Sequence, residues 1–125
     1  MADPTPIVPK TILAPFATYG AGLADFTFAA GTITDGDNWV CSGRDILVVR
    51  NTNVGAQTIT IVSVDDETNR AGSITAYSLA AGDFAAFGVG LTNSKGWQGT
   101  AKKIRITVSH AEVLVAVLTL PAGYP

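Results

Sequence analysis

The sequence predicts an all-β protein: a single β-sandwich or jelly-roll domain of about eight strands, behind an extended proline-rich N-terminal arm. Three features of the sequence support this fold class. Short segments rich in Val, Ile and Thr recur at spacings of about ten residues. Gly, Asp and Asn lie between these segments, where turns form. No ten-residue segment combines helical periodicity with capping residues at its ends.

The first 23 residues are predicted to form the arm. Four of the six prolines lie in it, and each proline lacks the N–H group of a helix and restricts the residue before it. These are Pro4, Pro6, Pro9 and Pro15. The glycine-rich segment 19–22 leads into the β-sandwich domain, which we place at residues 24–121, and residues 122–125 form a C-terminal tail.

Four strands are expected in the first half of the domain. In 26–28 two phenylalanines alternate around a threonine, and 39–41 follows the turn residues 35–37. Segment 45–51 is β-branched and apolar on both faces. Segment 58–64 gives the strongest strand prediction because it consists almost entirely of Thr, Ile and Val.

The second half is expected to hold four more strands. Segments 74–79 and 84–87 flank the turn 81–83. Segment 103–109 alternates cleanly, which turns Ile104, Ile106 and Val108 toward the core. Segment 113–120 closes the domain and is apolar on both faces.

Two of these strands, 45–51 and 113–120, therefore need cover on both sides. In a simple two-sheet sandwich one face of each strand meets water. The N-terminal arm of the same chain, a loop or another subunit can supply the missing cover, and the sequence leaves these alternatives open.

Composition limits the kinds of partner. The chain of 125 residues suits one domain, and only 14% of it is charged, against about 25% in an average globular domain. A surface poor in charge favours packing against other proteins. The net charge of -2 and the lack of a basic stripe argue against a nucleic-acid partner. No apolar run approaches the roughly 18 residues of a membrane helix, so no membrane partner is expected.

No catalytic constellation is recognisable. His110 is the single histidine, and the adjacent Ser109 points to the opposite face of an extended segment. We expect Glu112 to be a turn contact. Cys41, the single cysteine, is expected to be a small buried hydrophobe. The protein is predicted not to be an enzyme.

No metal or cofactor site is expected either. Residues 35–38 (Asp-Gly-Asp-Asn) lack the spacing and terminal glutamate of a calcium loop, and turn chemistry explains them. The acidic run 65–67 is expected to be a solvated turn. Segment 88–90 (Gly-Val-Gly) lacks the third glycine of a dinucleotide-binding turn.

The candidate interface residues lie in the arm and at two aromatic positions. Trp97 follows Lys95 and Gly96 in an expected loop, and Tyr124 lies in the tail, where a neighbouring molecule would have to cover it. The full set is Pro4, Pro6, Ile7, Val8, Pro9, Trp97 and Tyr124.

Several strand segments resemble those of a known protein class. Residues 43–52 read Gly-Arg-Asp-Ile-Leu-Val-Val-Arg-Asn-Thr, and the other segments concerned are 57–61, 74–79, 81–83, 87–88 and 115–121. Together they resemble small structural proteins of tailed bacteriophages, in particular head-decoration (capsid cement) proteins. The resemblance covers roughly residues 24–121.

The resemblance implies a virion protein. Such a protein is synthesised in the host cytoplasm and binds the capsid exterior as a homo-oligomer, a trimer or a dimer. It bridges subunits of the major capsid protein and so stabilises the shell. The family has no catalytic residues and no cofactor.

Three other functional interpretations stay open. A head–tail connector or tail structural protein belongs to the same structural class. A carbohydrate-binding β-sandwich would use Trp97, Trp39 or Tyr77 as a stacking platform. A cupin-like enzyme is disfavoured because such enzymes need several metal-binding histidines and this chain has one.

Overall fold

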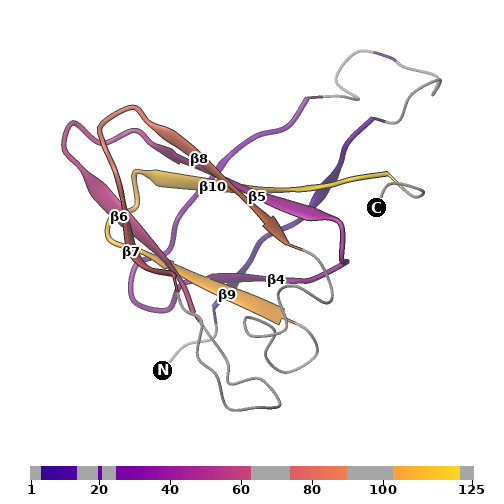
Figure 1. Ribbon diagram of the computed structural model, residues 1–125, viewed down its shortest axis with the longest axis horizontal. Coiled ribbons are helices and arrows are strands. Elements are labelled where there is room, and N and C mark those ends of the chain that lie inside the picture. The colour runs from indigo at the N-terminus through magenta and orange to yellow at the C-terminus, as the bar shows by residue number, and fades with distance from the viewer. Residues whose placement is uncertain (1–3, 14–19, 21–24, 63–73, 90–102, 122–125) are drawn as a thin grey trace.

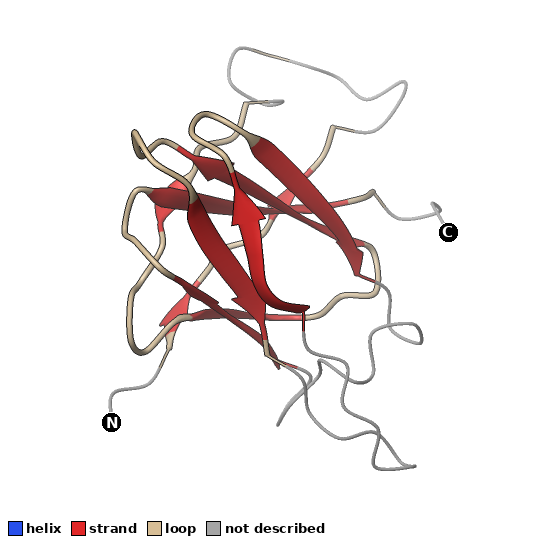
Figure 2. Cartoon of the chain, turned by 60° about the vertical axis from the view of Figure 1, so that its left-hand side comes forward, coloured by secondary structure: helices blue, strands red, loops and turns tan. Residues whose placement is uncertain are grey.

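The protein is seen in a computed structural model that describes residues 4–13, 20, 25–62, 74–89 and 103–121 (Figures 1 and 2). All regular elements of these residues are strands, which confirms the predicted all-β class, and no helix there has the length and apolar character to cross a membrane. The strands are β1 (Thr5–Pro6), β2 (Lys10–Thr11), β3 (Ala29–Ala30), β4 (Asp37–Val40), β5 (Asp45–Asn51), β6 (Gln57–Ile61), β7 (Ile74–Leu79), β8 (Phe84–Val89), β9 (Lys103–Val108) and β10 (Val113–Thr119).

The strands form two sheets that pack as two layers, the arrangement of a β-sandwich. One sheet has the order β1-β4-β9-β6-β7, and the other has the order β2-β10-β5-β8 with β3 also paired to β10. Figure 1 shows β5, β8 and β10 above β4 and β9. The longest ladder joins β10 to β5 antiparallel over seven residue pairs, and β5 joins β8 over six.

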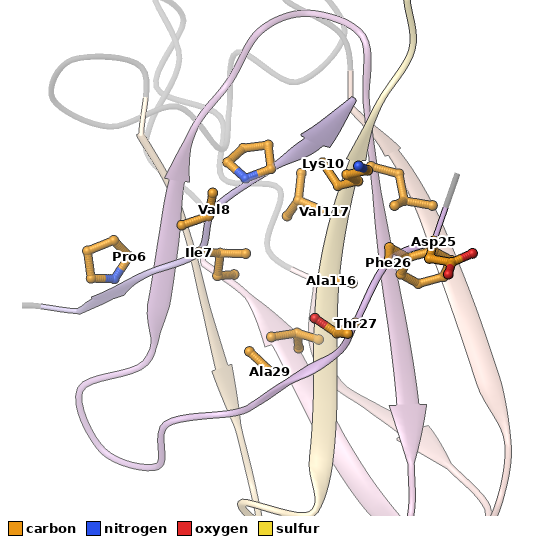
Figure 3. Close-up of a pocket in the computed structure, with 13 residues that line it drawn as sticks. Pro6, Ile7, Val8, Lys10, Asp25, Phe26, Thr27, Ala29, Ala116 and Val117 are labelled. Atoms are coloured by element: carbon orange, nitrogen blue, oxygen red, sulfur yellow. The ribbon is translucent and has the colours of Figure 1, made fainter. Parts of the chain in front are cut away.

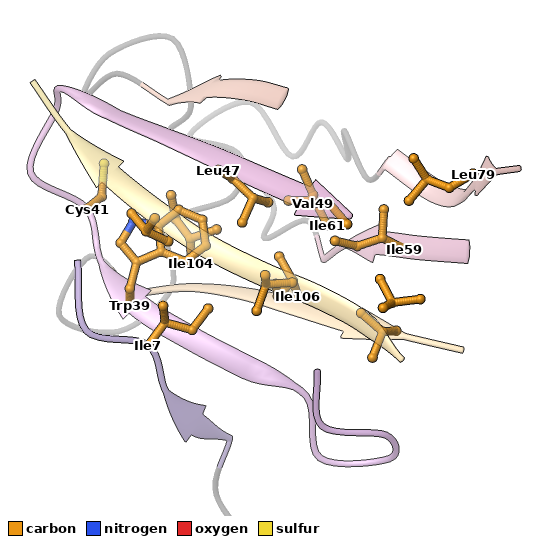
Figure 4. Close-up of a cluster of buried hydrophobic side chains, with 14 residues drawn as sticks. Ile7, Trp39, Cys41, Leu47, Val49, Ile59, Ile61, Leu79, Ile104 and Ile106 are labelled. Atoms are coloured by element: carbon orange, nitrogen blue, oxygen red, sulfur yellow. The ribbon is translucent and has the colours of Figure 1, made fainter. Parts of the chain in front are cut away.

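The core lies between the two layers (Figure 4). Successive residues of a strand point to opposite faces, so the alternating apolar residues of each strand meet in the middle. Ile104, Ile106 and Val108 all belong to this core, as predicted. Leu47 and Val49 oppose them from β5 and are fully buried. Each such side chain contributes about 2 kcal/mol of hydrophobic stabilisation.

The strand predicted at 26–28 is wrong, because pairing to β10 begins only at Ala29. Gly31 explains the position of this contact. A Cβ atom on Gly31 would lie 2.5 Å from Val108 Cγ2 and 2.7 Å from the Val113 carbonyl oxygen. The chain can approach β10 this closely only where side chains are small. Of the remaining predicted strands, 45–51 and 74–79 match β5 and β7 at both ends. The others correspond to β4, β6, β8, β9 and β10 with one or both ends shifted, and positions 63 and 64 lie outside the described residues.

The described part of the arm, residues 4–13, is extended and packs on its own domain. β1 pairs parallel with β4 at the edge of one sheet, and β2 pairs parallel with β10 in the other. Between them Ile7 enters the core and is 9% exposed. The arm therefore connects the edges of both sheets. The boundary predicted at residue 23 and the tail at 122–125 lie outside the described residues.

Candidate interaction surface

The outer face of the β10-β5-β8 sheet is almost entirely apolar. Its three strands pair in a continuous register, which brings nine outward-facing residues into three rows. Arg50 is the single charged residue among the nine. The nine are Ile46, Val48, Arg50, Phe84, Ala86, Gly88, Leu114, Ala116 and Leu118. We call this set the apolar face.

The opposite sheet has the outer face expected of a strand that meets water. Lys103, Arg105 and Thr107 alternate along β9 with the buried core residues. The neighbouring strands add Asn38, Val40, Thr58, Thr60 and Ser78 to this outward face. Val40 is the one apolar side chain of the eight. The contrast between the two sheets means that the apolar face is a particular property of one side of the molecule and not a general feature of the surface.

Three phenylalanines and an arginine gather at one end of the apolar face. Phe26 and Phe28 meet edge to face with ring centroids 5.5 Å apart, and Phe28 lies 6.4 Å from the ring of Phe84. The guanidinium carbon of Arg50 stands 5.1 Å from the centroid of Phe84. Phe84 is still 61% exposed and Phe26 is 42% exposed. Aromatic residues beside an arginine are typical of the energetically dominant positions in protein interfaces.

A groove runs along the edge of β10 beside the apolar face (Figure 3). It forms because the pairing of β10 with β3 ends at Val115 and the pairing with β2 begins at Leu118. Ala116 and Val117 face the resulting gap, which has a volume of about 590 Å³. Lys10 and Asp25 are the two charged residues of an otherwise largely apolar lining.

The predicted interface residues of the arm separate into two kinds. Ile7 is buried in the core of its own chain, so it anchors the arm. Val8, the next residue, is 87% exposed. Pro6 and Pro9 are exposed and Pro4 is half-buried. The two aromatic candidates, Trp97 and Tyr124, lie outside the described residues.

The aromatic platform of the carbohydrate-binding reading is only partly present among the described residues. Trp39 is 2% exposed and donates its indole N–H to Asp45, so it cannot stack on a sugar. Tyr77 is 47% exposed and meets Phe87 edge to face at 5.7 Å.

His110, Asp35 and Asp37, which the sequence analysis considered as possible catalytic or metal-binding residues, form local hydrogen bonds at turns. His110 Nδ1 accepts the Glu112 backbone N–H at 3.0 Å and lies 3.8 Å from the Glu112 carboxylate. The buried Asp37 accepts two hydrogen bonds from Thr32, and the backbone carbonyl of Asp35 accepts two from Arg105. Cys41 is buried, as expected.

Metal-binding geometry is likewise not found in the described part of the chain. No group of three or more His, Cys, Asp or Glu side chains there is placed to hold a metal ion. The acidic run 65–67 lies outside the described residues.

The cluster of Phe26, Phe28, Phe84 and Arg50 was not predicted from the sequence. The available signal was that 45–51 and 113–120 are apolar on both faces, and the register makes these two strands neighbours in one sheet.

Comparison with protein-family models, curated proteins and solved structures finds no match for this chain.

Proposed function

We propose that the protein is a non-catalytic viral structural protein that binds the outer surface of a capsid and stabilises the shell by bridging subunits of the major capsid protein. The observation that carries the proposal is the apolar face, with one charge in nine outward positions. Ala116 is already buried within the chain and four of the nine positions are partly buried, whereas Arg50, Phe84, Ala86 and Gly88 are exposed. Exposed apolar surface of this kind marks a site of interaction with another protein. The resemblance described above supplies the class of partner.

The mechanism is binding that favours the assembled shell. A ligand that binds only one state of its partner stabilises that state by mass action. Each contact with a capsid subunit can be weak, because contacts made by one homo-oligomer, a trimer or a dimer, reinforce each other through effective concentration. The exposed Phe26 and Phe84 offer the aromatic anchors of such a contact, and Arg50 offers a cation for a carboxylate of the partner. No cofactor, nucleic acid or membrane takes part.

The first test is the copy number of the protein in purified virions, measured against the major capsid protein. A ratio of about one, or a simple fraction such as about one third, supports a place on the shell lattice. A handful of copies per particle supports the head–tail connector or tail alternative. Complete absence overturns the proposal and favours the carbohydrate-binding alternative.

A matched pair of variants tests the surface itself. Phe26→Asp alters the aromatic cluster, and Ile33→Asp makes the same change at a side chain of similar exposure, 42% against 49%, in the turn before β4. Shells lacking the protein are mixed with each variant and the bound fraction is measured. We expect Phe26→Asp to lower binding at least about tenfold, as for an interface anchor, and Ile33→Asp to bind like the original protein. Equal binding by both variants contradicts the use of this surface.

A further inference from the structure

β8 is the last strand of its sheet in the described part of the chain. β8 pairs with β5 on one side, and none of the described residues pairs with its other side. Its sequence from Phe84 to Val89 has no charged residue and no proline, and its register with β5 runs without a bulge. Natural proteins usually protect such an edge with charges, proline or a bulge, because it is a template for another strand.

β7, one of the two edge strands of the other sheet, is irregular where β8 is regular. β7 has a register shift between Ile59 and Ile61 of its neighbour, and Ala76 takes a φ of 51°. The Ala76 N–H donates to the Thr60 Oγ1 of the neighbouring β6 at 2.9 Å, at the point of the irregularity. The irregularity makes β7 a poor template for a further strand.

The hydrogen-bonding groups at the open edge of β8 can be identified from the pairing on its closed edge. Asn51 N–H donates to the Asp83 carbonyl at 2.9 Å, which fixes the alternation along the following strand. Residues 85, 87 and 89 therefore direct their backbone groups to β5. Phe84, Ala86 and Gly88 direct their N–H and C=O groups outward.

Nothing among the described residues requires glycine at position 88. Gly88 is not among the described glycines with positive φ, and a Cβ atom there would meet nothing within 4 Å. Glycine weakens a strand, and in a strand interior it often marks a place where another backbone or ligand comes close.

We propose that β8 pairs antiparallel with β8 of a second copy, around a two-fold axis at Ala86. In this register Phe84 lies opposite the partner's Gly88, and Phe87 lies opposite the partner's Ala85, so each large side chain meets a small one. The outward N–H and C=O groups of Phe84, Ala86 and Gly88 then satisfy each other across the axis. Neither strand carries a charge that would oppose the approach.

The dimer formed in this way is an extended sheet in which the two apolar faces adjoin. A strand of six residues is about 20 Å long, which is short for an interface, since a standard one buries about 800 Å² per partner. We therefore expect a weak dimer, with monomer and dimer both present at ordinary protein concentrations. The inference does not rest on the proposed function, because the dimer is measured with the protein alone and shell binding is measured separately.

The first measurement is sedimentation of the full chain over a range of concentrations, together with amide hydrogen exchange. We expect a monomer–dimer equilibrium, and slower exchange of the Phe84, Ala86 and Gly88 amides as the concentration rises. A monomer at every concentration overturns the proposal and leaves the edge to a strand of a different protein. A dimer in which these three amides exchange at an unchanged rate also overturns it.

Two substitutions then separate the edge from general surface effects. Ala86→Lys places like charges opposite each other on the axis, and Ala56→Lys adds the same charge at an exposed turn position before β6. We expect the dissociation constant to rise at least about tenfold for Ala86→Lys and to stay the same for Ala56→Lys. An unchanged constant for Ala86→Lys overturns the register.

Gly88→Val supplies a test that misfolding cannot imitate. No described residue lies within 4 Å of a Cβ atom at position 88, and valine favours a strand, so the monomer should unfold at a higher temperature. The same side chain meets the partner's Phe84 in the proposed register, so the dimer should weaken several-fold. A variant that raises both stability and association contradicts the proposal.

Discussion

The indole Nε1 of Trp39 donates a hydrogen bond to the carboxylate of Asp45 at 3.1 Å and so links the two sheets through the interior. Trp39 belongs to β4 and Asp45 to β5, and both are 2% exposed. The same carboxylate accepts the Ser42 N–H at 2.8 Å, the Ser42 hydroxyl, and the Thr119 hydroxyl at 2.8 Å. A buried carboxylate is tolerated when its oxygens are saturated in this way.

Replacing this carboxylate by an amide should destabilise the fold. Asp45→Asn keeps the shape but turns one acceptor into a donor, which leaves donors facing each other in the interior. We expect a loss of about 2–3 kcal/mol in the free energy of unfolding, measured by urea denaturation. Asp83→Asn is the control, because Asp83 is exposed and its hydrogen bonds in the turn come from its backbone. Equal stability of the two variants contradicts the role given to Asp45.

Asn51 provides a second prediction, at the opposite end of β5. It is fully buried, and its Nδ2 donates to the carbonyls of Gly55 and Leu79, both at 3.0 Å. Its Oδ1 accepts the Asn53 N–H at 2.9 Å. Asn51→Ala should lower the free energy of unfolding by about 2–3 kcal/mol, because buried backbone groups lose their partners.

The comparison for Asn51 is Asn53, a half-buried neighbour in the turn. Asn53 donates from its side chain to the Glu112 carboxylate at 3.0 Å in an exposed contact. Its Oδ1 also accepts the Gly55 N–H at 2.8 Å in a part-buried contact. Asn53→Ala should cost about 1 kcal/mol in thermal denaturation, less than Asn51→Ala, because the groups that lose a partner are less deeply buried. A larger loss for Asn53→Ala than for Asn51→Ala would show that the surface contact holds this end of the sandwich.

The strand segments were predictable because a two-residue period leaves a direct record in the sequence. Ile104, Ile106 and Val108 alternate with Lys103, Arg105 and Thr107, and the structure places the first set inside and the second outside. The need for cover on 45–51 and 113–120 was also readable, because their outward residues are apolar. The sequence does not contain the information that these segments are adjacent, since the pairing joins residues far apart in the chain.

The buried polar contacts were not predictable for a different reason. Asp45 and Asn51 each begin or end an apolar strand, where a polar residue is usually a solvated turn residue. Their burial follows from the positions of Trp39, Thr119 and Leu79, which only the folded chain brings near. The strand predicted at 26–28 was wrong for the same kind of reason. The chain pairs with β10 near Gly31, and that close approach depends on atoms of β9 and β10 that only the folded chain brings near.

Two glycines should respond in opposite ways to the same small change. Gly31→Ala brings a Cβ within 2.5 Å of Val108 and should cost about 1–3 kcal/mol through overpacking. Gly88→Ala meets open space and should raise stability by about 0.5–1 kcal/mol, since glycine in a strand carries an entropic penalty. Both are measured by thermal denaturation at a concentration where the protein is monomeric. Similar losses in both variants contradict the close packing at Gly31.

The last prediction compares two adjacent residues of the arm. A change at the first should affect the stability of the fold, and a change at the second should affect binding to the shell. Ile7 is 9% exposed and Val8 is 87% exposed, although they are adjacent. Ile7→Ala should destabilise the fold by about 2–4 kcal/mol, as for other buried aliphatic truncations, and should leave binding by the folded protein unchanged. Val8→Asp should leave stability within about 0.5 kcal/mol and should weaken binding to the shell, because Val8 is the most exposed apolar side chain of the described arm. Unfolding curves and shell binding are measured on both variants. If Val8→Asp binds the shell unchanged, the exposed side of the arm is no part of the contact, and the arm serves only to hold the two sheets of its own domain together.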